Sequence, residues 1–182
     1  MNLKLSFSEK SNLKALFKVI MNNASLYEEA DRLQNSALLR ILEHNIFYGS
    51  ISDVKIDEGY ISDKAASLLA EGGLESDLTQ DHVFSPQRYA RFFYKNIMNM
   101  TFEEFLEYII PLCYVIRVTK KENNELMNLE KANKKENKFV IDKYEQMGII
   151  IRRGYHTYNK IPDDIMDAMP SILKEINYDY DI

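Results

Sequence analysis

The sequence has few of the residues that build cross-linked, loop-rich or membrane-embedded proteins. Its 182 residues include one cysteine, no tryptophan, six glycines and four prolines. The single cysteine, Cys113, excludes an internal disulfide and a cysteine-rich zinc site. No run of about 18 apolar residues is present, and charges interrupt the apolar residues near the N-terminus, so we expect neither a membrane span nor a secretory signal. These features predict an intracellular, cytoplasmic protein.

The composition is that of a folded chain with an uneven distribution of charge. Hydrophobic residues make up 46% of the chain, and twelve tyrosines and nine phenylalanines provide large apolar area for a core. The formal net charge is −5, yet residues 117–160 contain 11 Lys and Arg against 6 Asp and Glu, a local charge of +5 that leaves −10 for the rest. We therefore expect a basic surface that can meet phosphates and an acidic surface elsewhere.

Helix-start signals predict a predominantly helical α+β chain that forms a single domain over residues 1–182. A Ser or Thr followed three residues later by Glu is a capping box, and this pattern predicts helix starts at Ser25, Thr101 and Thr119. Ser85 followed by Pro86 predicts another start. The predicted helices lie around residues 13–20 and over 25–49, 62–73, 86–99, 102–110, 120–135 and 138–147; the predicted strands cover 113–118 and 149–158, with a turn at Gly154, and 51–62 is a possible strand pair.

One short stretch, LTQDHVFSPQ (residues 78–87), places an Asp-His pair directly before a helix start. A neutral imidazole can take a proton from water, while a carboxylate and a second oxygen or nitrogen donor hold a hard cation. Asp81 and His82 would lie on one strand, residues 113–118 would form a second, and Asn123 or Asn124 would lie on the first turn of the next helix. These segments predict a small ββα element embedded in a helical body.

The pair in TQDHVFSP, together with IRVTKKENNEL (residues 116–126), resembles the HNH, or His-Me finger, family of endonucleases over about residues 78–130. The resemblance implies metal-dependent hydrolysis of DNA phosphodiester bonds, with His82 as general base and with Asp81 and Asn123 as ligands of Mg²⁺ or Mn²⁺. That family orients the base with an asparagine from a loop, and here two predicted helices intervene; Asn96 and Asn99 are the candidates for this role. Residues 1–75 would form a helical N-terminal part, and residues 131–182 a C-terminal extension of helix and strand.

Basic residues near the proposed site could position the nucleic acid. Their side chains can donate hydrogen bonds to phosphate oxygens, and tyrosines beside them can stack on bases. The candidates are Arg117, Lys120, Lys121, Arg152 and Arg153. Arg152 and Arg153 lie near His156, which has Tyr155 and Tyr158 on either side.

The same residues also have ordinary structural interpretations. Asp81 can brace the loop before Pro86 while His82 packs against Phe84, and Asn123 can be a solvated residue at a capped helix start. A second functional hypothesis is therefore a non-catalytic, mostly helical phage or bacterial protein that binds a basic protein partner through its acidic N-terminal portion. A third is a protein that binds DNA without cutting it.

Overall fold

The computed structural model describes residues 6–52, 54–135 and 141–176, which divide into two compact units. The helical unit contains the described residues up to Lys55 together with Ser85–Cys113, and the sheet unit contains Ile56–Phe84 and the described residues from Tyr114 onward. The fold is predominantly helical α+β, as the sequence predicts. The predicted helical insertion after His82 groups with the N-terminal helices.

The helical unit begins with the long helix α1 (Phe7–Arg32), which is capped by Ser6. The Ser6 hydroxyl accepts a hydrogen bond from the Glu9 backbone N–H at 3.2 Å, and the Glu9 carboxylate accepts one from the Ser6 N–H at 2.7 Å. The predicted helix start at Ser25 is wrong, because this residue lies inside α1. Buried apolar residues continue past it at helical spacing, and they hold the helix together where the local capping pattern predicted a break; they are Leu13, Leu16, Ile20, Ala24 and Tyr27.

A second run of helix follows α1 after a turn at Gln34, whose φ is +52°. Asn35 caps the run by accepting a hydrogen bond from the Leu38 N–H at 3.1 Å. The run passes through α2 (Ser36–Arg40), a π-helix η1 (Ile41–Tyr48) and α3 (Gly49–Ile51), so it ends two residues after the predicted end near Gly49. In its core, the ring of Phe47 lies 5.3 Å from that of Phe93, between centroids.

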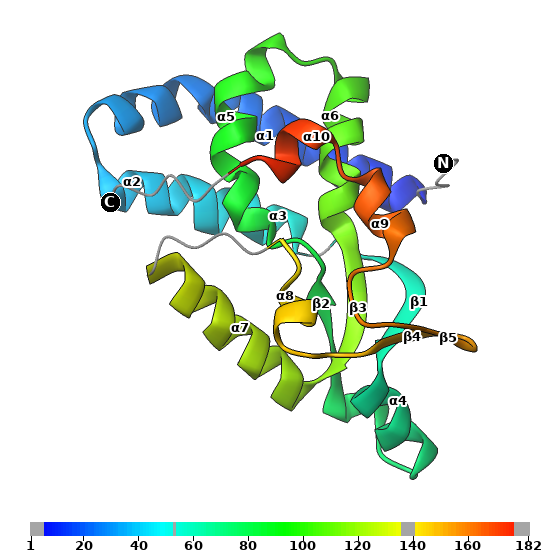
Figure 1. Ribbon diagram of the computed structural model, residues 1–182. Helices are drawn as coiled ribbons and strands as arrows, with labels where there is room; N and C mark the ends of the chain where they lie inside the picture. The colour runs from blue at the N-terminus through cyan, green and yellow to red at the C-terminus, as the bar shows by residue number, and fades with distance from the viewer. Residues whose placement is uncertain (1–5, 53, 136–140, 177–182) are drawn as a thin grey trace. The chain divides into compact units, whose positions relative to one another are not determined.

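The chain returns to the helical unit through residues 86–113. The prediction of helix after Ser85 is confirmed, as a 3₁₀ turn at Pro86–Tyr89 followed by α5 (Ala90–Asn96) and a second 3₁₀ turn at Ile97–Asn99. The predicted capping box at Thr101 is also confirmed at the start of α6 (Phe102–Ile109). Figure 1 shows α5 and α6 crossing α1, and the ring of Tyr94 on α5 stacks on that of Tyr27 on α1 at 4.6 Å.

The sheet unit is built on five strands in the order β2-β3-β1-β4-β5. β1 is the middle strand of the sheet; β3 lies between β2, to which it is antiparallel, and β1, to which it is parallel, while β4 and β5 form a hairpin with a turn at Gly154 (φ +57°). The predicted hairpin is confirmed; the possible strand pair in 51–62 is instead a single strand. The bounds are β1 (Ile56–Ser62), β2 (Leu78–His82), β3 (Tyr114–Thr119), β4 (Ile151–Arg153) and β5 (His156–Tyr158).

Five helices accompany this sheet in the described part of the chain. Ser62 caps α4, and the helix closes at Gly72, whose φ of +88° suits a residue without a side chain. The predicted helix over 138–147 is shorter, covering 143–146, and residues 138–140 lie outside the described residues. The helices are α4 (Asp63–Ala70), α7 (Lys120–Lys135), α8 (Lys143–Gln146), α9 (Asp163–Ala168) and α10 (Ser171–Lys174). No helix of the described residues combines the length and apolarity needed to cross a membrane.

Candidate active site

The strand, strand and helix that the Asp-His pair predicts are present in the sheet unit. β2 pairs with β3 in antiparallel register, which sets Asp81 opposite Ile116 and His82 opposite Val115. α7 begins at Lys120, directly after β3 ends, and packs against both strands. The chain therefore brings the segments around residues 78–82 and 120–124 into one ββα element, although more than thirty residues separate the two strands.

A capping box fixes the start of α7 against the sheet. The Glu122 carboxylate accepts hydrogen bonds from the Thr119 N–H and hydroxyl, each at 3.0 Å, and from the Ser62 hydroxyl at 2.6 Å. Glu122 is buried, so these three donors replace the water that its carboxylate loses on folding. The first turn of α7, including Asn123, is therefore held in place by both β3 and the end of β1.

The carboxylate of Asp81 already has two partners within the unit. The Lys143 ammonium lies 2.8 Å from its Oδ2, and the Tyr144 hydroxyl donates a hydrogen bond to the same oxygen. The ammonium of Lys143 also contacts the Glu130 carboxylate at 3.0 Å and donates to the backbone oxygen of His82 at 2.8 Å. Asp81 is thus neutralised by an internal cation rather than open to an external one.

The titration of this cluster follows from its burial and its charges. Burial alone would lower the pKa of Lys143, but the Asp81 and Glu130 carboxylates outweigh it and raise that pKa above the usual value for lysine. Burial, reinforced by the charge of Asp81 and its hydrogen bond, raises the pKa of Tyr144 well above the value for a free tyrosine. Lys143 is therefore charged and Tyr144 is neutral at physiological pH.

The imidazole of His82 does not share the surroundings of the Asp81 carboxylate. Neighbouring residues on a strand direct their side chains to opposite faces of the sheet, so the two side chains leave β2 on different sides. His82 is 8% exposed and Asp81 is 9% exposed, so a substrate reaching the imidazole needs local opening.

Asn123 lies on the first turn of α7, as predicted, and is half-buried. Its amide nitrogen contacts the sulfur of Met127 at 3.7 Å. Among the described residues, no hydrogen bond or ion pair joins its side chain to Asp81 or His82, and no group of three or more His, Cys, Asp or Glu is arranged to hold a metal. In this arrangement the predicted ligands do not form an open divalent-cation site, because Lys143 and Tyr144 both contact Oδ2 of Asp81 and Asn123 is not joined to it.

The two candidates for orienting the base belong to the helical unit. Asn96, at the end of α5, donates a hydrogen bond from its side-chain amide to the Phe92 backbone oxygen at 2.7 Å. Asn99 is an exposed residue at the end of a 3₁₀ turn. The contact of Asn96 is an ordinary helix-end interaction, so the role of either residue in orienting His82 stays a prediction.

The predicted nucleic-acid residues separate into paired arginines and unpaired lysines. Arg117 lies 3.9 Å from Asp57 and 3.7 Å from Glu75, Arg152 pairs with Asp63, and Arg153 lies 3.1 Å from Glu58 and 3.3 Å from Asp164. Lys120 and Lys121 are exposed and form no ion pair with any described carboxylate. Lys120 and Lys121 are therefore the residues of this set whose charge no carboxylate offsets.

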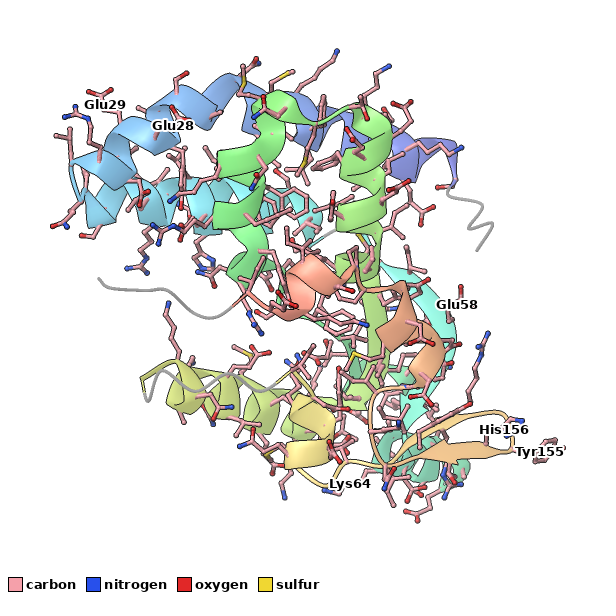
Figure 2. The ribbon with its side chains drawn as sticks, turned by 45° about the horizontal axis from the view of Figure 1, so that its top comes forward. Glu28, Glu29, Glu58, Lys64, Tyr155 and His156 are labelled. Carbon is pink, nitrogen blue, oxygen red and sulfur yellow. The ribbon has the colours of Figure 1, made fainter. Side chains whose placement is uncertain are left out.

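The β4–β5 hairpin exposes Tyr155 and His156, which follow Arg152 and Arg153 in the sequence. Figure 2 shows Tyr155 and His156 at its tip, directed away from the rest of the unit, and Tyr155 is fully exposed. Tyr158 lies nearer the sheet, with its ring 5.9 Å from that of Tyr60. Tyr155 is therefore open to a partner, whereas Tyr158 is partly covered within the unit.

Lys143, Tyr144 and Glu130 are the residues that sequence reasoning missed. They look like ordinary members of polar helices. Lys143 and Tyr144 contact Asp81 from 62 and 63 positions away in the chain, and Glu130 joins the cluster through Lys143. No local pattern distinguishes a lysine that will be buried from one that stays in water.

No family model, no curated protein and no solved structure matches this chain.

Proposed function

We propose that the chain is an endonuclease that hydrolyses phosphodiester bonds of DNA, with His82 as the general base. The observation that supports this proposal is the ββα element, in which the strand bearing His82 pairs with the strand that leads directly into α7. This is the order of elements that the Asp-His pair and the Thr-Lys-Lys-Glu-Asn segment predict together. Neither motif by itself requires that the two segments lie side by side.

The chemistry asked of His82 is modest. A neutral imidazole nitrogen takes a proton from water while the water oxygen bonds to phosphorus, and the bond from phosphorus to the departing sugar oxygen breaks. That departing oxygen then takes up a proton from solvent. Mg²⁺ or Mn²⁺ is the proposed cofactor; Asp81 and Asn123 are the residues that would hold it, and the ion would supply positive charge to offset the charge on the departing oxygen.

The Lys143 ammonium sets a condition on this cofactor. Because the Lys143 ammonium lies 2.8 Å from Oδ2 of Asp81, an ion that uses this oxygen as a ligand has to displace the ammonium first. Such a competition lowers the apparent affinity for the metal, so we propose a weakly bound, exchangeable ion rather than a tightly held one.

Incubation of the purified chain with supercoiled plasmid, in parallel with Mg²⁺, Mn²⁺ or EDTA, tests the proposal. The expected result is conversion to open-circular or linear plasmid with either metal and none with EDTA. Nicking that persists in EDTA would remove the metal from the proposal, and the absence of nicking under all three conditions would remove the endonuclease.

The second candidate is a protein-binding module with an acidic surface, and the structure changes where that surface would lie. Residues 1–55 and 85–113 contain 10 Lys and Arg against 9 Asp and Glu, whereas residues 56–84 and 114–179 contain 13 against 18. The acidic excess is therefore in the sheet unit, which includes residues 56–75 of the N-terminal portion, and not in the helical unit. Six of its carboxylates lie in one stretch, at Asp57, Glu58, Asp63, Glu71, Glu75 and Asp77.

A further inference from the structure

α7 carries its lysines on the side that faces solvent. The residues of this helix that are exposed are Lys120, Lys121, Asn124, Met127, Asn128, Lys131, Ala132 and Lys134. At 100° per residue, Lys120, Asn124 and Lys131 fall on one narrow stripe, and Lys121 and Asn128 lie along its flank. Glu122, Leu126 and Asn133 are buried on the opposite side of the helix. The exposed side therefore contains lysines and amides, together with Met127 and Ala132, and no exposed carboxylate.

Two of the three acidic residues of α7 are paired with other groups of the protein. Glu122 accepts the hydrogen bonds of Ser62 and Thr119, and Glu130 is paired with Lys143 at 3.0 Å. Glu125 is half-exposed; it lies about 140° around the helix from Lys120 and about 40° from Lys121, with which it forms no ion pair. Lys120, Lys121 and Lys131 form no ion pair with a described carboxylate, so their charge is available to a partner.

We propose that this lysine stripe (Lys120, Lys121 and Lys131, with Asn124 and Asn128 between them) binds the phosphate backbone of a DNA duplex. The inference rests on the proposed function, since it names the surface along which the substrate of that element lies. At about 1.5 Å per residue, Lys120 and Lys131 are about 16 Å apart along the helix axis, which matches about five nucleotide steps of one DNA strand. The lysines supply charge, and the asparagine amides donate hydrogen bonds to phosphate oxygens.

The composition of the stripe favours nucleic acid over a protein or a membrane as its partner. Protein interfaces depend on buried aromatic or aliphatic anchors, and the only large apolar side chain on the exposed side of α7 is Met127. Membrane-surface helices combine a basic side with a broad apolar side that inserts among the lipids, but the apolar residue Leu126 of α7 is buried within the protein.

Fluorescence anisotropy with a labelled 20-base-pair duplex, measured in EDTA across a range of salt concentrations, tests the inference. The triple variant Lys120→Gln, Lys121→Gln, Lys131→Gln removes three charges from α7. Each lysine that contacts a phosphate contributes about 0.9 to the slope of log affinity against log salt, so the triple variant should bind more weakly and show a slope smaller by about 2 to 3.

A matched control comes from α1, where Lys10, Lys14 and Lys18 are exposed at four-residue spacing. The Lys10→Gln, Lys14→Gln, Lys18→Gln variant removes the same charge from the helical unit, and its salt slope should equal that of the wild-type chain. An equal loss in both triple variants would show that only net charge matters and would overturn the inference, as would an unchanged slope in the α7 variant or no binding by the wild-type chain.

The design separates this inference from the proposed function. Binding is measured in EDTA and does not depend on cleavage, so a chain that binds through α7 but never nicks DNA keeps the inference and loses the endonuclease. A chain that nicks DNA equally well with and without the three lysines keeps the endonuclease and loses the inference. Anionic phosphatidylglycerol vesicles, added as a competitor, should displace the duplex only weakly; full displacement at equal phosphate concentration would point to a lipid surface instead.

Discussion

At the scale of single residues, Lys143 connects the buried polar groups around Asp81. Its ammonium satisfies Asp81, Glu130 and the backbone oxygen of His82, and its side chain is 7% exposed. A buried ion pair contributes little net stability compared with an apolar pair, but removing one partner leaves an uncompensated charge. Lys143 therefore matters mainly through what its loss would do to Asp81.

We expect the Lys143→Met substitution to lower the free energy of unfolding by about 3 to 5 kcal/mol, because it strands the buried Asp81 carboxylate. Urea denaturation followed by circular dichroism measures this change. Lys64→Met is the control, since Lys64 is exposed and its loss should change stability by about 0.5 kcal/mol or less. A loss for Lys143→Met as small as that of the control would show that the cluster is not an organised ion pair.

The same variant tests whether Asp81 can bind a metal. If Mg²⁺ takes the place of the ammonium, Mg²⁺ should raise the melting temperature of Lys143→Met more than that of the wild-type chain. The double variant Lys143→Met, Asp81→Asn should lose this response. Equal, small shifts in all three chains would indicate that Asp81 is a structural residue only.

The pH dependence of stability has a defined sign at this cluster. The pKa values of Lys143 and Tyr144 are both raised in the folded chain, so above about pH 10 the folded state holds protons that the unfolded state releases. The stabilisation is fully present below the ordinary pKa of these groups and is lost as the pH rises through their folded values. Urea midpoints should fall between pH 9 and pH 11 in the wild-type chain, and this fall should be smaller in a Lys143→Met, Tyr144→Phe variant.

At the scale of elements, two capping boxes have the same sequence pattern, a Thr followed three residues later by Glu, but differ in burial. Glu104 caps α6 from an exposed position, and hydrogen bonds with Thr101 lower its pKa. Glu122 caps α7 from a buried position and also holds the Ser62 hydroxyl. The sequence predicted both helix starts correctly, because a capping box involves only neighbouring residues. The contact of Glu122 with Ser62, at the end of β1, depends on the fold and was not predicted.

We therefore expect Glu122→Ala to destabilise the chain more than Glu104→Ala. The buried substitution leaves the Ser62 hydroxyl and the Thr119 N–H without their acceptor, which costs about 2 to 4 kcal/mol, whereas the exposed one loses only hydrogen bonds that water can replace. Urea midpoints of the two variants provide the comparison. Similar losses would mean that Ser62 contributes nothing beyond the helix cap.

At the scale of the whole molecule, the sequence predicted features that depend on neighbouring residues, such as helix starts and strands. It did not predict contacts between residues far apart in the chain. The strand at 114–119 and the helix after Thr119 follow from β-branched residues and a capping box. The pairing of β1 with both β3 and β4, and the salt bridge of Lys143 with Asp81, depend on residues far apart in the chain. The helix start predicted at Ser25 was wrong because the local capping pattern lies within a longer repeat of apolar residues, which continues the helix.

The division into two units also changes how the predicted insertion is understood. Residues 85–113 separate β2 from β3 in the chain, and they pack with α1 and the helices that follow it. The ββα element thus spans two segments of one unit, while the residues between them complete the core of the other. A deletion of 85–113 would therefore damage the helical unit and would not isolate the element.

The central claim is that the imidazole of His82 carries the cleavage of DNA, and the nicking rate of His82→Ala measured against His156→Ala tests it most directly. Both variants lose one histidine from the sheet unit, and His156 is exposed at the tip of the hairpin. With folding checked by circular dichroism, nicking by His82→Ala should fall by about a hundredfold or more, because a positioned general base contributes at least that much, while His156→Ala should keep the wild-type rate. Equal nicking by the two folded variants would contradict the account.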